Sequence, residues 1–265
     1  MERNINKSMK RVLKVRRREL IMGTKIALIT GASRGIGAAI ALRLASEGWH
    51  LVLNCIHSEE KILELKTYIE LHYCTSCISF IGDMGDYDTV AALFEQIKLQ
   101  YGTLDMVVNN AGISYMGLLS DMSIRDWEQI MSVNLTSIYN TSKQAIPMML
   151  SGKSGKIVNI SSVWGNVGAS CEVAYSTTKG GMNAFTKALA KELAPSNIQV
   201  NAIACGVIDT DMNNSLSAED KDELMEEIPT GRLGTPEEVA DLVYQLATGP
   251  GYLTGQIITL DGGWL

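Results

Sequence analysis

The sequence lacks the features of a membrane protein and of a disulfide-stabilised secreted protein. No apolar run is long enough to span a bilayer, so we predict a soluble protein with no membrane partner. Cysteine is scarce, with five residues at irregular spacings: Cys55, Cys74, Cys77, Cys171 and Cys205. An odd number of scattered cysteines indicates reduced thiols, and we therefore expect a cytoplasmic protein.

A complete set of metal ligands is also missing. Cys74 and Cys77, with His72 close by, supply half of a zinc-binding pattern, but no second pair of ligands follows at a matching spacing. We therefore predict that the protein binds no metal. We interpret the two cysteines as small apolar residues that lead into a strand.

Positive charge is concentrated at one end of the chain. The net charge is −6, yet residues 1–25 carry nine Lys and Arg against two Glu, which leaves −13 on the remainder. A body this acidic repels the phosphates of a nucleic acid. We therefore expect no nucleic-acid partner.

The basic segment 1–23 has three interpretations. Its Arg-rich, acid-poor composition fits a targeting peptide, and it also fits an arm that contacts an acidic partner or a membrane surface. We favour a third interpretation, an extension outside the native protein whose translation starts at Met22, because the first predicted strand follows directly at residue 25. The folded domain is then expected to span 24–265.

Short apolar runs alternate with longer amphipathic stretches along this domain. We predict strands over 25–30, 51–54, 78–81, 106–109, 156–160, 199–204 and 256–260. We predict helices near 35–47, 59–72, 87–100, 123–150, 174–194 and 236–247. Strands that alternate with helices form βαβ units, and near-continuous apolar runs are typical of parallel strands buried on both faces. The predicted fold is a single α/β domain, a doubly wound Rossmann-type parallel sheet of seven strands with helices on both faces.

A glycine-rich turn follows the first predicted strand. It reads Thr30-Gly31-Ala32-Ser33-Arg34-Gly35-Ile36-Gly37 and leads into a helix. Glycines let the backbone approach a phosphate closely, and the helix N-terminus offers free N–H groups to the anion. The Gly-x-x-x-Gly-x-Gly spacing is one residue longer than the common dinucleotide fingerprint. We predict that Gly31, Ser33, Arg34, Gly35, Ile36 and Gly37 bind a nicotinamide dinucleotide.

The end of the second predicted strand lacks the acid that would bind the 2′-hydroxyl of NAD. Here the chain reads Leu53-Asn54-Cys55-Ile56-His57-Ser58, and the first acid is Glu59. Arg34 is placed for bidentate contact with a 2′-phosphate, and His57 and Ser58 add donors. The sequence therefore favours NADP(H) over NAD(H).

Further cofactor contacts are predicted after the third and fourth strands. Asp83, in Gly82-Asp83-Met84, either accepts a hydrogen bond from the adenine amino group or caps the next helix. In Asn109-Asn110-Ala111-Gly112, small residues allow close approach of the cofactor and the Asn side chains can brace neighbouring strands. We assign Asp83, Met84, Asn110, Ala111 and Gly112 to the cofactor site.

Tyr175 and Lys179 are four residues apart on the predicted helix 174–194 and so share one face of it. An ammonium beside a phenol favours the phenolate, and we expect the pKa of Tyr175 to lie below its usual value of about 10. Such a phenol can donate or accept a proton during catalysis.

Together these residues resemble the classical short-chain dehydrogenase/reductase family across 24–265. The matching motifs are residues 30–37, residues 109–112, Asn134, Ser162, and Tyr175 with Lys179. The resemblance implies that Tyr175 donates the proton in carbonyl reduction. It implies that Lys179 lowers the pKa of Tyr175 and binds the nicotinamide ribose, that Ser162 binds the substrate oxygen, and that Asn134 holds a water of a proton relay. Ser161 is a weaker candidate, because the family places this Ser thirteen residues before the Tyr.

The segment after the sixth strand departs from the family pattern. Cys205-Gly206 stands where the family has Pro-Gly. Gly206, Ile208 and Thr210 match cofactor contacts of the family. Without the fixed φ angle of a proline, we expect residues 207–210 to be less well ordered, with activity retained.

Within the family, the sequence is most similar to bacterial 3-oxoacyl-[acyl-carrier-protein] reductases of fatty acid biosynthesis. The matching segments are 31–35, 133–135, 201–204, 254–256 and 261–263. This resemblance implies an NADPH-dependent homotetramer that reduces a 3-oxoacyl thioester, with acyl carrier protein as a candidate partner.

The family's substrate lid is acidic in this chain, which argues against an acidic carrier protein. Residues 209–227 carry eight acids and one base, and Ser196 stands at the family's second basic contact. Basic contacts would then come from Lys143, Lys153 or Lys156. The apolar lid residues suit an acyl chain and a steroid equally well: Met212, Leu216, Leu224, Met225 and Ile228. The alternatives are an NAD(P)-dependent dehydrogenase or reductase of another small alcohol or ketone (a hydroxysteroid, sugar or polyol), and a catalytically silent dinucleotide-binding regulator.

Overall fold

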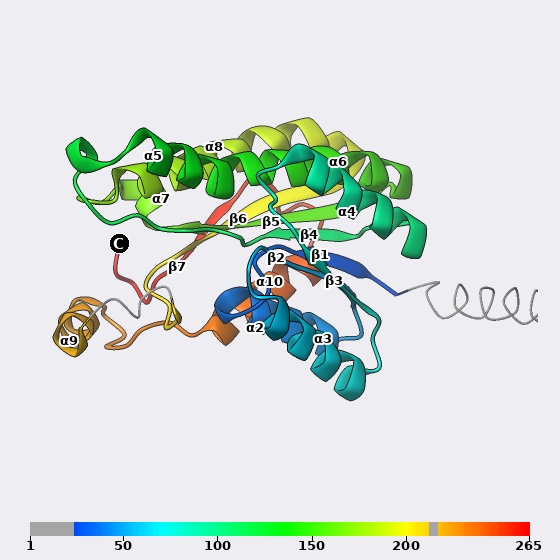
Figure 1. The fold of residues 1–265 in the computed structure, drawn as a ribbon, viewed down its shortest axis with the longest axis horizontal. Coiled ribbons are helices and arrows are strands. Elements are labelled where there is room, and N and C mark those ends of the chain that lie inside the picture. Colours follow the sequence, from blue (N-terminus) through cyan, green and yellow to red (C-terminus); the bar gives the residue numbers. More distant parts are fainter. Residues whose placement is uncertain (1–23, 212–216) are drawn as a thin grey trace, which may run out of the picture.

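A single parallel sheet forms the centre of the molecule and is covered by helices on both faces (Figure 1). This computed structural model describes residues 24–211 and 217–265; the predicted basic extension, Met212 and Leu216 lie outside them. The strands follow the order β3-β2-β1-β4-β5-β6-β7, and all neighbours pair in parallel. They are β1 (Ile26–Ile29), β2 (His50–Cys55), β3 (Cys77–Ile81), β4 (Met106–Asn109), β5 (Gly155–Ser162), β6 (Ile198–Cys205) and β7 (Ile257–Leu260). The predicted doubly wound, seven-stranded sheet is confirmed.

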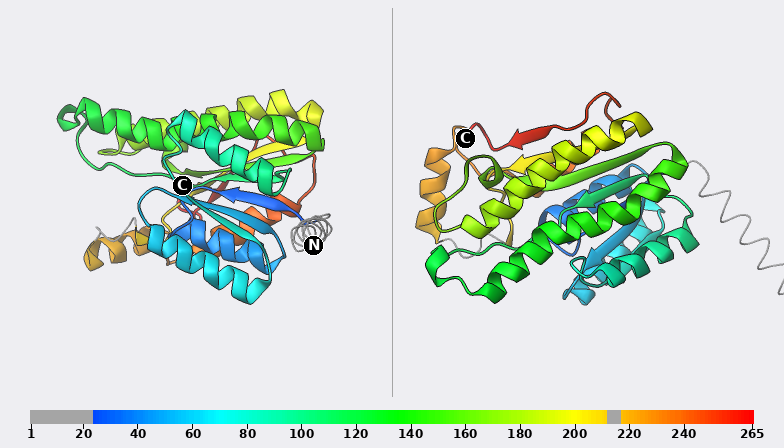
Figure 2. Two further views of the ribbon diagram at one scale, coloured as in Figure 1. Left: turned by 45° about the vertical axis from the view of Figure 1, so that its right-hand side comes forward. Right: turned by 90° about the horizontal axis from the view of Figure 1, so that it is seen from above.

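The helices form two layers, which Figures 1 and 2 show on opposite sides of the sheet. One layer holds α2 (Gly35–Ser46), α3 (Glu59–Tyr73) and α10 (Pro236–Thr248). The other holds α4 (Tyr87–Gln100), α5 (Ile124–Met131), α6 (Ser137–Gly152) and α8 (Val173–Leu193). Short elements complete the chain: η1 (Leu119–Asp121), η2 (Ser132–Thr136), α7 (Trp164–Val167), η3 (Ala194–Ser196) and α9 (Ala218–Glu227). No helix in the described ranges is long and apolar enough to cross a membrane.

The core consists of two apolar clusters, one on each face of the sheet. In β1, Ala27 and Ile29 point into the cluster beneath α2 and α10, whereas Ile26 and Leu28 point into the cluster beneath α4 and α6. Successive side chains of a strand alternate between faces, so a strand buried on both sides needs apolar residues throughout. The layers therefore explain why the strands read as continuous apolar runs in the sequence.

The predicted helix over 123–150 is interrupted, which corrects the sequence-based expectation of one continuous helix. Between α5 and α6 the five residues of η2 form a π turn, in which the N–H of Ser137 bonds to the carbonyl of Ser132. The turn carries Asn134 into the protein interior, where its amide bonds to the backbone of Ile113. Single π turns of this kind are frequent at functional sites.

The helix α9 was not predicted from the sequence, because its residues are mostly acidic and show no helical spacing of apolar side chains. A local signal was available, because Ser217 and Asp220 have the spacing of a capping box. Ser217 Oγ accepts a hydrogen bond from the backbone N–H of Asp220 at 3.0 Å, and the Asp220 carboxylate accepts one from the N–H of Ser217 at 3.0 Å. These reciprocal bonds fix the start of the helix.

Candidate functional site

The turn between β1 and α2 presents free N–H groups at the carboxyl edge of the sheet. The N-cap residue of α2, Arg34, makes no side-chain cap, and the first turn contains no acid. Gly31 and Gly35 have φ angles of +63° and +52°, which side chains rarely adopt, and a Cβ atom at Gly37 would overlap the carbonyl of Gly31. This helix N-terminus fits a phosphate of a dinucleotide.

Hydrogen bonds join this turn to the end of β4. The side-chain amide of Asn110 donates to the carbonyls of Thr30 and Gly31, both at 3.0 Å. Thr30 Oγ1 accepts from the backbone N–H groups of Asn110 and Ala111, also at 3.0 Å. The structure therefore brings together the two motifs that the sequence analysis assigned to the cofactor.

The end of β2 lies against the same turn, because the N–H of Ala32 donates to the carbonyl of Asn54 at 2.8 Å. His57 is exposed, and Ser58 is the N-cap of α3 but makes no side-chain cap bond. Arg34 pairs with Asp211 at 3.6 Å, and both side chains are exposed. Asp211 could not be predicted as a partner of Arg34, since no local spacing links the two residues.

Of the two roles predicted for Asp83, the structure excludes the cap of the helix that follows β3. The N-cap of α4 is Asp86, whose carboxylate accepts from the N–H groups of Asp88 and Thr89, so Asp83 does not cap this helix. Asp83 Oδ1 instead closes a local turn by accepting from the N–H of Gly85 at 2.7 Å. The Met84 side chain is buried in the core, so only its backbone can contact a cofactor.

A buried polar chain braces β4, β5 and α8, as the sequence analysis predicted for the Asn residues after the fourth strand. The Asn109 amide donates to Asn159 Oδ1 at 2.8 Å, and Thr141 donates to Asn109 Oδ1 at 2.7 Å. The Asn159 amide in turn donates to Thr186 Oγ1 on α8 at 2.8 Å. This chain fixes α8 over the end of the sheet.

Ser162 is the last residue of β5, and its Oγ accepts a hydrogen bond from the N–H of Trp164 at 3.2 Å. Its neighbour Ser161 donates to Asn183 Oδ1 at 2.7 Å and is thereby held in the core. The Ser162 hydroxyl also lies near the Tyr175 phenol, where it favours the ionised form of the phenol. Ser162, and not Ser161, is therefore the hydroxyl that meets the tyrosine.

Lys179 lies one helical turn beyond Tyr175 and is buried. Its Nζ donates to the carbonyl of Ile160 at 2.8 Å and lies 5.5 Å from the centroid of the Tyr175 ring. A Cβ atom at Gly112 would be 3.6 Å from this Nζ. Lys179 therefore connects the tyrosine, the end of β5 and the predicted cofactor loop after β4.

The pKa of Tyr175 is raised in the structure, which corrects the expectation of an acidified phenol. Burial is the main cause, and the nearby Ser162 hydroxyl opposes it. Burial also lowers the pKa of Lys179 to about 8, so the ammonium remains the main form at neutral pH but titrates just above it. A phenol that stays protonated at neutral pH suits proton donation, the direction needed in a reduction.

The Asn134 side chain acts as a brace between elements. Its amide exchanges two hydrogen bonds with the backbone of Ile113, both at 2.8 Å, and donates a third to Thr178 Oγ1 at 3.1 Å. The sequence analysis did not single out Thr178, although its place next to Lys179 was a usable signal. The role of Asn134 in holding a water stays a prediction.

The segment after β6 is held by backbone pairing, despite the cysteine at its start. A Cβ atom at Gly206 would lie 2.8 Å from the Cα of Asp261, so the glycine is required for close packing. Ile208 pairs with Gly234, and the N–H of Asp209 donates to the Gly234 carbonyl at 2.8 Å. These contacts position the segment without a proline, and its looser order stays a prediction. They also place Thr210 beside the N-terminus of α2, where a Cβ atom at Gly35 would lie 3.4 Å from its methyl group.

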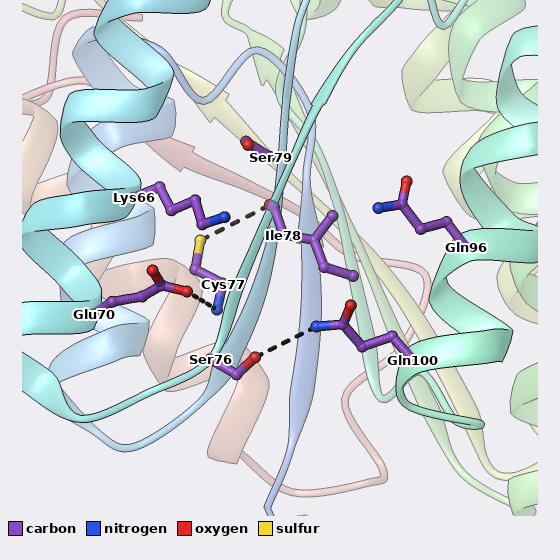
Figure 3. A pocket seen from close by; sticks show the side chains of 8 residues that line it. All are labelled: Lys66, Glu70, Ser76, Cys77, Ile78, Ser79, Gln96 and Gln100. Carbon is purple, nitrogen blue, oxygen red and sulfur yellow. Dashed lines mark hydrogen bonds between the residues drawn. The ribbon is translucent and has the colours of Figure 1, made fainter. Parts of the chain in front are cut away.

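A cavity of about 220 Å³ lies elsewhere, at the β3 edge of the sheet (Figure 3). Lys66 and Glu70 of α3 line it on one side, and Gln96 and Gln100 of α4 on the other. None of the predicted catalytic or cofactor residues lines it. Within 24–211 and 217–265, no group of three His, Cys, Asp or Glu side chains is arranged to hold a metal ion.

Comparison with known proteins yields relatives over nearly the whole chain. A family model described as short chain dehydrogenase matches residues 25–221. The uncharacterised oxidoreductase YmfI of Bacillus subtilis (strain 168) is 39% identical over 241 residues, which cover 91% of this chain and 98% of that protein. The 3-oxoacyl-[acyl-carrier-protein] reductase FabG of Aquifex aeolicus (strain VF5) is 41% identical over 246 residues, 92% of this chain and 99% of that protein. The crystal structure of YwfH, described as an NADPH-dependent reductase involved in bacilysin biosynthesis, superposes with a TM-score of 0.87 at 30% identity, covering 92% of this chain and 99% of that one.

The lowered pKa of Lys179 can be measured directly. In protein labelled with ¹³C at lysine Cε, we expect one resonance to titrate with a pKa of about 8, because burial disfavours the ammonium. This resonance should be missing in Lys179→Met and present in Lys187→Met, which alters an exposed lysine of the same helix. Titration of the Lys179 resonance near the ordinary value of about 10.4 would show that the environment of this ammonium has been misjudged.

Proposed function

The chain belongs to the short chain dehydrogenase family of oxidoreductases, and we propose that it catalyses the NADPH-dependent reduction of a 3-oxoacyl thioester to the 3-hydroxyacyl form. The observation that carries this proposal is the position of the Ser162 hydroxyl near the Tyr175 phenol, with Lys179 bonded to the adjacent end of β5. The turn that fits a phosphate lies at the same edge of the sheet. Several relatives at about two-fifths identity are 3-oxoacyl-[acyl-carrier-protein] reductases, which supports the thioester as substrate.

The residues of the site can perform the proton chemistry of such a reduction. Residues of the glycine-rich turn and Asn110, Ala111 and Gly112 would hold the nicotinamide cofactor, which would supply the hydride when bound. Ser162 and Tyr175 donate hydrogen bonds to the carbonyl oxygen and stabilise the negative charge that grows there. Tyr175 then gives its proton to this oxygen and completes the alcohol.

Two observations support NADP(H) as the cofactor. The residues that follow β2 include no acid before Glu59, and Arg34 lies exposed at the start of α2. A guanidinium there can bind a 2′-phosphate through two parallel hydrogen bonds. The structural relative YwfH is described as NADPH-dependent, in agreement with this assignment.

Delivery of the substrate on a carrier protein has weaker support. Lys153 and Lys156 lie at the start of β5, whereas Ser162 ends this strand. At about 3.3 Å per residue, the eight residues of β5 separate the two ends by roughly 25 Å. In addition, α9 carries six acids and one base. This acidic helix favours a second candidate function, a dehydrogenase or reductase of another small alcohol or ketone, such as a hydroxysteroid, sugar or polyol.

A substrate panel tests the proposed function. Acetoacetyl thioesters, 3-ketosteroids and keto-sugars are offered with NADPH and with NADH, and oxidation of the nicotinamide is followed at its absorbance band. We expect turnover of the thioesters with NADPH, and growth rescue of a bacterial strain that lacks its own 3-oxoacyl reductase. Turnover of only the steroids or sugars would establish the second candidate, and the absence of any turnover would favour a silent regulator.

The pair formed by Arg34 and Asp211 generates a prediction about cofactor affinity. Arg34→Ala should weaken NADPH binding at least about tenfold, because a charge-assisted bidentate contact is lost, and should change NADH binding little. Asp211→Asn should strengthen NADPH binding up to about fivefold, because an exposed ion pair worth up to about 1 kcal/mol no longer competes for Arg34.

Titration calorimetry with both cofactors measures these affinities, and Arg125→Ala, which removes an exposed arginine of α5, is the control. Equal losses of NADPH and NADH affinity in Arg34→Ala would refute a specific contact with the 2′-phosphate.

A further inference from the structure

Four side chains connect the catalytic helix α8 to α9 through the C-terminal tail. The side chain of Trp164 lies beside the carboxyl group of Glu172, the N-cap residue of α8, and favours its ionised form. The rings of Trp164 and Trp264 meet edge to face, with 5.1 Å between centroids and 63° between planes. Trp264 Nε1 donates to the Glu227 carboxylate of α9 at 3.3 Å. Burial raises the pKa of the Glu172 carboxyl group, and the neighbouring Trp164 side chain opposes this effect.

This row of four side chains lies next to Ser162 and Tyr175, whose hydroxyl groups are proposed to hold the carbonyl oxygen. Trp164 donates its backbone N–H to Ser162 Oγ at 3.2 Å. Glu172 precedes Tyr175 by three residues, which places both on one face of the first turn of α8, and the charge of Glu172 contributes to the raised pKa of Tyr175. Tight packing fixes the arrangement, because a Cβ atom at Gly165 would lie 2.7 Å from the Lys179 backbone.

Along α8, Lys179 and Glu172 lie on opposite sides of Tyr175, and only Lys179 faces the predicted cofactor loop. Lys179, one turn beyond Tyr175, faces Gly112 and the loop assigned to the cofactor. Glu172 lies at the other end of this face, with Trp164 and Trp264 beside it. We infer that a ketone bound between Tyr175 and the cofactor would have Trp164 and Glu172 on its other side.

We propose that Glu172 and Trp164 determine the charge of the substrate, by accepting a neutral substituent next to the ketone and rejecting a carboxylate there. This inference rests on the proposed function and deepens it. An indole ring offers apolar contact to an acyl thioester, whereas a carboxylate would meet the like charge of Glu172 in a partly buried setting. The pair thus separates a 3-oxoacyl thioester from the free 3-oxo acid that its hydrolysis releases.

The test compares two ketones that differ in this charge, acetoacetate and its ethyl ester. Their dissociation constants are measured by calorimetry in the complex with the oxidised dinucleotide, in which no hydride can be delivered, so that binding is read without turnover. Glu172→Gln removes the charge but keeps a polar side chain of the same size beside Trp164. Glu192→Gln, at an exposed position of the same helix, is the matched control. Near-ultraviolet circular dichroism of the paired indoles checks that the fold around Trp164 is retained.

We expect the parent protein to bind the ester at least about a hundredfold more tightly than acetoacetate, and Glu172→Gln to reduce this ratio at least about tenfold through better binding of acetoacetate. Lys179 is present in both proteins, so its effect on the binding of acetoacetate is the same in both and does not change the comparison. A ratio that is the same in Glu172→Gln, Glu192→Gln and the parent would overturn the proposal, as would a failure of the parent to prefer the ester.

A separate turnover assay with acetoacetyl thioester distinguishes this inference from the proposed function. If the ratio changes as expected while the thioester is not reduced, then the charge selection stands and the thioester assignment fails. If the thioester is reduced while the ratio does not change, then the thioester assignment stands and the role of Glu172 fails.

Discussion

The burial of one ammonium group constrains the whole site. Lys179 is 4% exposed, and its Nζ is held by the carbonyl of Ile160 beneath the Tyr175 ring. Burying an ammonium is costly, and the lowered pKa of Lys179 is the measure of that cost. The position is maintained because α8 is fixed to β5 by the hydrogen bond from Asn159 to Thr186 and by that from Ser161 to Asn183. A cofactor that binds beside Gly112 would meet this charge.

The electrostatic state of the tyrosine agrees with a reductive direction. Burial keeps the Tyr175 phenol protonated, and the nearby Glu172 carboxyl group acts in the same sense. The nearby Ser162 hydroxyl favours the ionised form and therefore assists the release of the proton when charge develops on the substrate. Glu172 beside the tyrosine and the acids of α9 add negative charge, and the proposed preference for a neutral substrate rests on Glu172.

Much of this arrangement could be predicted from the sequence, because parallel strands require apolar runs and the motifs follow them in order. The pairing of Asn109 with Asn159, and the convergence of the glycine turn with Asn110, were accessible in this way. Three features could not be predicted from the sequence. The π turn around Asn134 depends on a tertiary contact with Ile113, the raised pKa of Tyr175 depends on burial that no spacing encodes, and the contact of Trp164 with Trp264 joins residues a hundred positions apart. Local pattern carries no information about such long-range packing.

The central claim is that the Tyr175 hydroxyl delivers the proton that completes the alcohol. The most direct measurement is the single-turnover rate of ketone reduction in Tyr175→Phe with saturating reduced cofactor, alongside the cofactor affinity of the same variant. The account predicts a rate at least about a thousandfold below the parent, since a positioned proton donor typically contributes this much, with cofactor affinity nearly unchanged. A Tyr175→Phe protein that reduces the ketone as fast as the parent would contradict it.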